Sequence, residues 1–162
     1  PLLFHFLGAR AALSRLVLMF QREVAERLLA APAAPAYSAM AAQVQMLANV
    51  RRVCHVGSRG FLPPPKVDST VVLVEPLPAP RVPVRDLRRY AQVVRAAFGQ
   101  RRKTVRNALA SVFGEAAGPA LAAAGVEPQR RGETLSIAEF ARVADALPAG
   151  AVAAEAEEAG DA

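Results

Sequence analysis

The sequence contains one cysteine, Cys54, and only two histidines, His5 and His55. A single thiol cannot form an internal disulfide, and without clustered Cys or His partners it excludes a zinc site of ordinary spacing. We therefore expect no metal, a buried and inert Cys54, and histidines in core or edge positions. No apolar run approaches the roughly 18 residues of a membrane span, and no leader peptide can be read at the start. These absences predict a soluble, cytoplasmic protein with no membrane partner.

Acidic residues are scarce in one long stretch. Between Arg81 and Phe113 there are nine Arg or Lys residues and a single acid, Asp86. All 20 basic residues precede Pro148, whereas four of the 14 acidic residues lie beyond it, so residues 1–148 carry a formal charge of +10. Phosphate contacts by Lys and Arg release counterions, so this density favours a polyanion as partner. An arginine-rich solvated surface is the alternative, and charge alone does not separate the two.

The spacing of apolar residues predicts an α/β segment in the first half of the chain. Residues 1–7 read as the end of a helix, and the continuous apolar run at residues 16–20 is typical of a buried parallel strand. Helices are expected at residues 21–30 and 37–47, and Val-rich strands at residues 50–56 and 70–75. A strand followed directly by a helix indicates an α/β layer.

The second half reads as helical. The string PLPAPRVPV, from Pro76, has four prolines in nine residues and indicates an extended linker, which we place at residues 77–83. Amphipathic helices are expected at residues 86–98, 102–113 and 115–124, the last of these ending at Gly125. Ser136 and Glu139 form a capping box for a final helix to Leu147. The Ala, Glu and Gly tail at residues 149–162 is expected to be disordered.

The string FLPPPKVDSTVVLV, from Phe61, carries the most specific chemistry. Three successive prolines stiffen a loop that opens directly into a strand, so the loop can hold one side chain rigidly. Phe61 is the candidate, because enzymes that act on a base flip it out and stack it on an aromatic ring. A packing anchor is the commoner role for such a phenylalanine. Lys66 could contact a phosphate or simply be solvated.

Several strings together resemble the bacterial small-subunit ribosomal RNA adenine dimethyltransferases. They are LLFHFL, MFQREVAERLLAAP, the Tyr37-Ser38 pair, FLPPPKVDSTVV, FGQRRKTVRNAL and LSIAEFARVAD, in the order of that family up to Leu147. The resemblance implies an α/β plus α fold. Residues 1–76 would be the C-terminal part of a Rossmann-like methyltransferase domain, and residues 84–148 a small helical RNA-binding domain.

The same resemblance implies an activity and a set of site residues. The family transfers two methyl groups from S-adenosylmethionine to N6 of each of two adjacent adenines in small-subunit 16S ribosomal RNA, on the immature small ribosomal subunit. Phe61 would lie beside the target base. Arg101, Arg102, Lys103 and Arg106 would contact the RNA backbone. Lys66 and Asn107 are further candidates, and so are Arg130 and Arg131, for which a solvated loop pair is the alternative. The family's glycine-rich cofactor loop and Asn-Leu-Pro-Tyr motif match positions upstream of Pro1, so we expect no cofactor-binding residue here and no activity from the fragment alone.

The chain departs from the family pattern at Ala33, where glycine is usual, and at residues 40–42, where Leu-Ser-Val is usual. Two alternatives stay open. One is a non-enzymatic RNA-binding or ribosome-associated module made of the helical part. The other is an antibiotic-resistance methylase that modifies large-subunit RNA, against which the string FGQRRKTVRN argues.

Overall fold

The computed structural model describes residues 2–148, which form two compact units divided between Pro83 and Val84. The predicted tail at residues 149–162 lies outside the described residues. The first unit contains the strands and the second contains helices and short 3-10 turns. The division falls at the end of the proline-rich segment that the sequence indicates as a linker.

A three-stranded sheet organises the first unit. Its strands are β1 (Leu16–Gln21), β2 (Ala48–Val56) and β3 (Ser69–Pro76), in the order β1-β3-β2. Both pairs are antiparallel, so β1 and β2 run in the same direction on either side of β3. The segment between β1 and β2 holds two helices, α2 (Arg22–Leu29) and α3 (Ala39–Leu47). The observed positions of these strands and helices agree with the positions predicted from the spacing of apolar residues.

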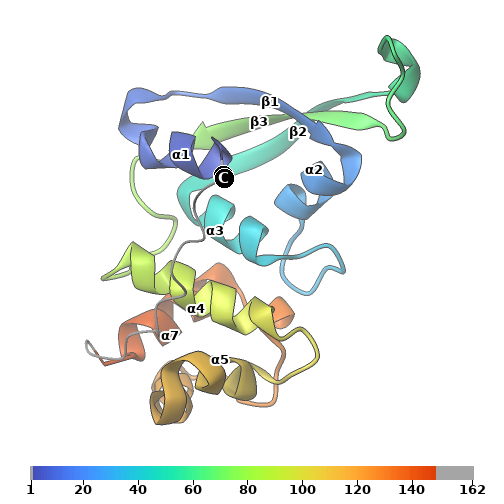
Figure 1. Ribbon diagram of the computed structural model, residues 1–162. Coiled ribbons are helices and arrows are strands. Elements are labelled where there is room, and N and C mark those ends of the chain that lie inside the picture. Colours follow the sequence, from blue (N-terminus) through green and yellow to red (C-terminus); the bar gives the residue numbers. More distant parts are fainter. Residues whose placement is uncertain (1, 149–162) are drawn as a thin grey trace, which may run out of the picture. The chain divides into compact units, whose positions relative to one another are not determined.

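Helices cover one face of this sheet. Figure 1 shows α2, α3 and the first helix, α1 (Leu2–Gly8), on the same side of the strands. The buried core between them and the sheet is contributed by Leu3, Leu7, Ala25, Leu28, Val44, Ala48, Val72 and Val74. Because side chains alternate along a strand, the residues between these core positions point to the other face. On that other face Val17 and Met19 of β1 are 62% and 52% exposed.

Two expectations for the first unit are wrong. The apolar run at residues 16–20 was expected to form a buried parallel strand, but β1 pairs antiparallel with β3 and exposes alternate residues, because the helices described cover only one face. Cys54 was expected to be buried, but it is exposed. It lies on β2, which is an edge strand, and residues 51–55 of that strand are all exposed.

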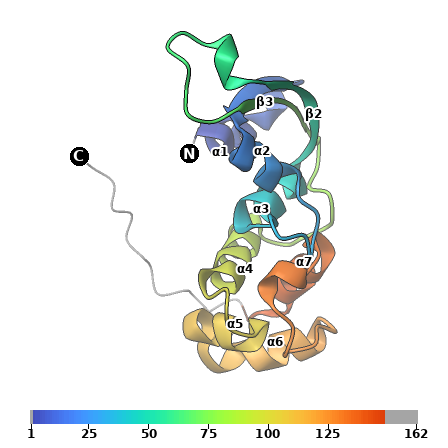
Figure 2. The same cartoon turned by 90° about the vertical axis from the view of Figure 1, so that its right-hand side faces the viewer.

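The second unit packs four helices together. They are α4 (Leu87–Gly99), α5 (Val105–Phe113), α6 (Ala117–Ala123) and α7 (Ile137–Ala146). Tyr90 of α4, Leu109 of α5 and Phe140 of α7 are among its fully buried side chains. Figure 2 shows α5 and α6 side by side at one end of this unit, in agreement with their contacts.

Local capping sets the helix ends of the second unit. The side chain of Asp86 accepts from the N–H of Arg88 at the start of α4, and Ser136 and Glu139 form the predicted capping box of α7. Gly125, with a φ of 64°, follows α6 as predicted. The helix expected from residue 102 instead begins at Val105, because Thr104 caps it through a bond from the N–H of Asn107.

Candidate base-binding and RNA-binding site

The loop that carries Phe61 leaves the sheet at the carboxyl ends of two strands. β2 ends at Val56 and β3 begins at Ser69, whose partner on the other side is Gln21, the last residue of β1. Figures 1 and 2 show the loop extending well beyond the strands. In open α/β sheets, ligands bind outside the carboxyl ends of the strands. The loop therefore lies at the edge of the sheet where ligands bind in folds of this kind.

Phe61 follows a 3-10 turn at Ser58–Gly60 and is half-buried. Its N–H donates to the carbonyl of Ser58 over 3.3 Å. The next residue, Leu62, is 99% exposed, and the three prolines after it are exposed as well. Phe61 is thus partly exposed, and its stacking role stays a prediction.

Asp68 fixes the base of this loop. Its Oδ1 accepts the N–H of Ser58 over 3.0 Å, at the other end of the loop. Its carbonyl accepts the N–H of Arg22, the first residue of α2, over 2.9 Å. One residue thus ties both ends of the loop to each other and to the end of β1. Sequence reasoning missed this role, although the position of Asp68 between the prolines and the strand was a usable signal.

Lys66, predicted to contact RNA, is exposed on the same loop. It lines a hollow of about 370 Å³ together with the first residues of α2 and with Asp68. Within the part of the chain that the structure describes, its ammonium group has no ion-pair partner. The structure therefore leaves Lys66 accessible to a phosphate.

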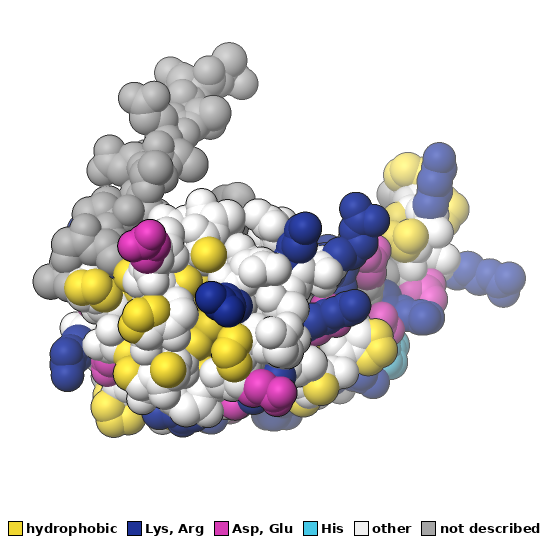
Figure 3. Space-filling model, turned by 90° about the horizontal axis from the view of Figure 1, so that it is seen from below, with side chains coloured by type: hydrophobic (Ala, Val, Ile, Leu, Met, Phe, Trp, Pro, Cys, Tyr) yellow, Lys and Arg dark blue, Asp and Glu magenta, His cyan; other side chains and the backbone are white. Residues whose placement is uncertain are grey.

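The turn between α4 and α5 holds the predicted basic cluster. Arg101, Arg102 and Lys103 are all exposed, and the turn is closed by the N–H of Lys103 donating to the carbonyl of Gln100 over 2.9 Å. Arg106 and Asn107 are exposed on the first turn of α5. None of these four basic side chains has an ion-pair partner among residues 2–148. Figure 3 shows Lys and Arg side chains extending from the surface into solvent.

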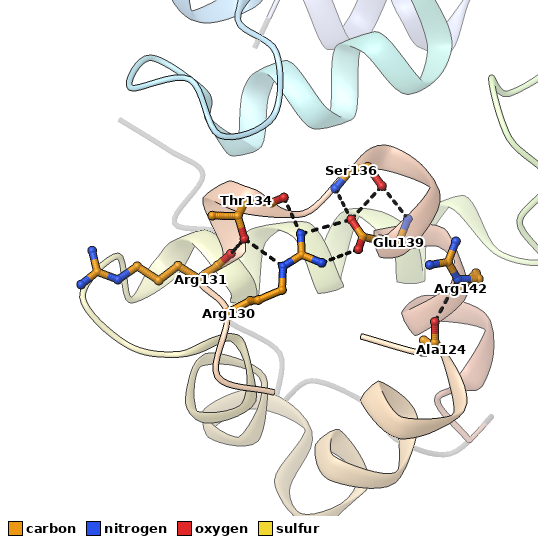
Figure 4. Close-up of polar contacts among 7 residues, drawn as sticks. All are labelled: Ala124, Arg130, Arg131, Thr134, Ser136, Glu139 and Arg142. Carbon is orange, nitrogen blue, oxygen red and sulfur yellow. Dashed lines mark hydrogen bonds and ion pairs between the residues drawn. The ribbon is translucent and has the colours of Figure 1, made fainter. Parts of the chain in front are cut away.

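Arg130 and Arg131 were both predicted to contact RNA, but their side chains have different surroundings in the structure. Figure 4 shows the Arg130 guanidinium directed at Glu139 and Thr134. It donates to both carboxylate oxygens of Glu139, to the carbonyl of Thr134 over 2.6 Å and to its hydroxyl over 3.2 Å. Arg131 points away, with a side chain 58% exposed and Glu133 4.0 Å distant. All three guanidinium nitrogens of Arg130 are thus used within the protein, and its contact with RNA stays a prediction.

The carboxylate that receives Arg130 is strongly perturbed. Partial burial alone would raise the pKa of Glu139, but hydrogen bonds from Arg130 and from the N–H and hydroxyl of Ser136 outweigh burial. Together with the positive charge of Arg130 they lower the pKa to about 2. The pair joins the loop before α7 to the helix itself, and the carbonyl of Arg130 also accepts the N–H of Val105 over 2.6 Å. Arg130 therefore helps to position the start of α5.

The described residues do not fit S-adenosylmethionine. Nucleotide-like cofactors in this kind of fold are held at a glycine-rich junction between a strand and a helix. The junction described is between β1 and α2, and the chain has no glycine between Gly8 and Gly57. Within residues 2–148 there is also no group of His, Cys, Asp or Glu that could hold a metal ion, and no helix long and apolar enough to cross a membrane.

Comparison with known proteins decides the family. The family model described as ribosomal RNA adenine dimethylase matches residues 1–148. The chain belongs to this family. Proteins named ribosomal RNA small subunit methyltransferase A are 43% identical over 148 residues in Syntrophotalea carbinolica and 44% identical over 153 residues in Geobacter metallireducens. These matches cover 90% and 92% of the chain but 56% of each relative, so the chain spans about half the length of the dimethylase relatives it matches.

Two solved structures share the fold. A dimethyladenosine transferase from Plasmodium falciparum aligns with a TM-score of 0.72 and 24% identity, over 88% of this chain and 60% of that one. The 23S rRNA methyltransferase ErmE aligns with a TM-score of 0.55 and 22% identity, over 83% of this chain and 55% of that one. The small antiparallel sheet and its helices thus have the fold of part of a Rossmann-like methyltransferase, which confirms the α/β assignment.

Proposed function

We propose that the complete dimethylase methylates ribosomal RNA and that this chain is its C-terminal, base-binding and RNA-binding part. The reaction is transfer of two methyl groups from S-adenosylmethionine to N6 of each of two adjacent adenines in the small-subunit RNA. Membership of the dimethylase family and relatives named for the small subunit support this assignment. S-adenosylmethionine would be held by residues outside this chain.

The proposal rests on the position and surroundings of Phe61. The ring is half-buried, on a proline-stiffened loop tied at both ends by Asp68, at the carboxyl ends of β1 and β2. The adenine amino group is a weak nucleophile because its lone pair is conjugated with the ring. Positioning is therefore the main catalytic requirement, and a fixed aromatic face can supply it by stacking on the flipped base.

The helical unit would hold the RNA backbone. Arg101, Arg102, Lys103 and Arg106 are exposed and lack ion-pair partners among the described residues, so they are available to phosphates. We include Asn107, Lys66 and Arg131 as further contacts because each is exposed. Arg130 is left out, since its guanidinium is already bound to Glu139 and Thr134.

Small ribosomal subunits that lack dimethyladenosine provide the test. The complete protein, incubated with these subunits and S-adenosylmethionine, should produce N6,N6-dimethyladenosine at two adjacent positions, measured by mass spectrometry of RNA fragments. Methylation of large-subunit RNA instead would identify a resistance methylase. RNA binding with no methylation of either subunit would identify a non-enzymatic module.

A further inference from the structure

A second hollow, of about 300 Å³, lies in the first unit between the start of α2 and the end of β2. Arg22 and Glu26 of α2 line one side of it, Arg52 and His55 of β2 line the other, and Asp68 lies at its border with the Phe61 loop. Gly57, the first residue of that loop, also lines it. The hollow therefore adjoins the base of the loop that carries Phe61.

Both carboxylates of this hollow already have partners. Glu26 accepts from Nε of Arg22 over 3.0 Å, and Asp68 accepts the N–H of Ser58. Arg52, in contrast, is exposed and has no hydrogen-bond or ion-pair partner for its side chain among residues 2–148. Asp68 keeps its negative charge, but Arg52 is the one guanidinium of the lining without a partner among residues 2–148, and the stretch between Ala48 and Val67 contains four basic residues and no acidic one. An anion is the ligand that this guanidinium would bind.

His55 supplies a second polar group. Its Nδ1 lies 3.0 Å from the hydroxyl of Thr70, a buried residue of β3. When that hydroxyl donates to Nδ1, the imidazole proton is on Nε2, which can then donate to a ligand. The contact with Thr70 also holds the ring in one orientation.

Alternation along β2 separates Arg52 from its neighbour Arg51. Arg52 is opposite Val72, a core residue of the face that the helices cover, whereas Arg51 is opposite Leu73. Successive side chains of a strand point to opposite faces, so Arg51 lies on the other side of the sheet, and it does not line the hollow. Arg51 and Arg52 are therefore adjacent and both exposed, but only Arg52 lines the hollow.

We propose that this hollow binds a backbone phosphate of the RNA strand that flanks the target adenine. The Arg52 guanidinium contacts the phosphate oxygens, a geometry for which its planar fork of donors is suited, and Nε2 of His55 donates to the same group. A base stacked on Phe61 brings its flanking phosphates past the base of the loop, where the hollow lies. This inference rests on the proposed function and adds an RNA contact in the sheet unit to those in the helical unit.

The test compares two neighbouring substitutions in the complete protein, Arg52→Gln and Arg51→Gln. The probe is a small-subunit RNA hairpin with two adjacent adenines, and the dissociation constant is measured over a series of salt concentrations. Arg52→Gln should weaken binding roughly threefold to tenfold at low salt and reduce the log-log salt slope by about 0.7 to 0.9, the loss of one phosphate contact. Arg51→Gln removes the same charge from the same strand. It should change both the dissociation constant and the salt slope less than Arg52→Gln does. Arg52→Lys should restore the slope, since the charge remains.

Equal effects of the two glutamine variants would overturn the inference, because general electrostatic attraction would then explain both. No effect of Arg52→Gln, together with weaker binding when Arg101, Arg102 and Lys103 are reversed, would overturn the inference and leave the proposed function standing. No effect of either change would count against both. Unchanged thermal melting of each variant is the required control.

Discussion

Ala33 adopts a backbone conformation that favours glycine. Its φ is 65°, in the left-handed region, and it is the third residue of a turn closed by the N–H of Ala34 donating to the carbonyl of Ala31 over 3.1 Å. Pro32 occupies the second position of this turn. Proline at the second position and a positive φ at the third are the features of a type II turn, in which glycine is preferred at the third position. The departure of this chain from the family glycine therefore has an energetic cost.

We predict that Ala33→Gly stabilises the protein. A left-handed residue with a Cβ is strained by about 1–2 kcal/mol, and part of the relief is offset by the greater chain entropy of glycine in the unfolded state. The free energy of unfolding should rise by about 0.5–1 kcal/mol, measured by urea denaturation. Ala31→Gly is the matched control, because Ala31 is also exposed but has no positive φ, and it should be neutral or destabilising. Equal destabilisation by both changes would contradict the argument.

Glu139 makes the stability of the helical unit depend on pH. Its folded-state pKa is about 2, below its ordinary value of 4.5, so the unfolded state binds a proton more tightly. The stabilisation is fully present above pH 4.5 and is lost as the pH falls from there through 2. We expect a loss on the order of 2 kcal/mol over this range, since the ion pair is partly exposed.

Denaturation of the chain at pH 6, 4 and 2.5 measures this effect. Glu139→Gln should flatten the decline between pH 5 and 2, because the titrating group is gone. Glu133→Gln, which changes a nearby carboxylate 4.0 Å from Arg131, is the control and should leave the decline in place. An unchanged decline in Glu139→Gln would show that another group titrates.

In the complete enzyme, Phe61→Ala should lower turnover on RNA roughly tenfold to a hundredfold. Alanine substitution of an aromatic residue that stacks on a base costs about 1–3 kcal/mol. Turnover falls because the base is no longer held in position for methyl transfer. Affinity for S-adenosylmethionine and the melting temperature should be preserved. Leu62→Ala is the matched control, because Leu62 is the adjacent residue and is 99% exposed. An alanine variant at Phe61 that unfolds before it loses activity would identify a packing anchor.

At the scale of elements, the turn between α4 and α5 is the proposed RNA-facing surface of the helical unit. Reversing Arg101, Arg102 and Lys103 to Glu should weaken RNA binding and flatten its salt dependence, because each lost phosphate contact reduces the log-log slope by roughly 0.7 to 0.9. The control, Arg101→Lys with Arg102→Lys, keeps the charge and should keep the slope. A slope that the reversal leaves unchanged would remove this turn from the RNA interface.

The elements that the sequence predicts well are those set by local interactions. The capping box of Ser136 and Glu139, the glycine stop at Gly125 and the exposure of a loop containing three prolines each depend on residues within a few positions. The start of α5 was misplaced because the basic residues before Thr104 are as compatible with a helix as those after it.

The features that sequence reasoning missed depend on distant residues. Asp68 joins residues ten and 46 positions away, and Arg130 is bound by Glu139 in the following helix. The neighbours of β1 are equally non-local, so an apolar run could not reveal whether its strand partner is parallel or antiparallel. The composition of Arg130-Arg131 likewise gave no sign that one guanidinium is bound internally and the other is exposed.

At the scale of the molecule, helices of the described residues cover only one face of the sheet. β1 pairs with β3 and with no other strand among residues 2–148, and Val17 and Met19 on its uncovered face are more than half exposed. Exposed apolar residues grouped on one face commonly mark a surface that contacts another part of a protein. This fits a chain that spans about half the length of its dimethylase relatives.

We predict that this chain alone neither binds S-adenosylmethionine tightly nor methylates RNA. Micromolar affinity corresponds to about 8 kcal/mol and requires a formed pocket, whereas the one strand-to-helix junction described before α2 has no glycine to admit a cofactor. Titration calorimetry should show no binding at micromolar concentration for the chain and clear binding for the complete protein. The chain should nevertheless bind RNA with a salt-dependent affinity, because its free basic residues remain. Cofactor binding by the chain at micromolar affinity or better would contradict the prediction and show that a cofactor pocket exists within these 162 residues.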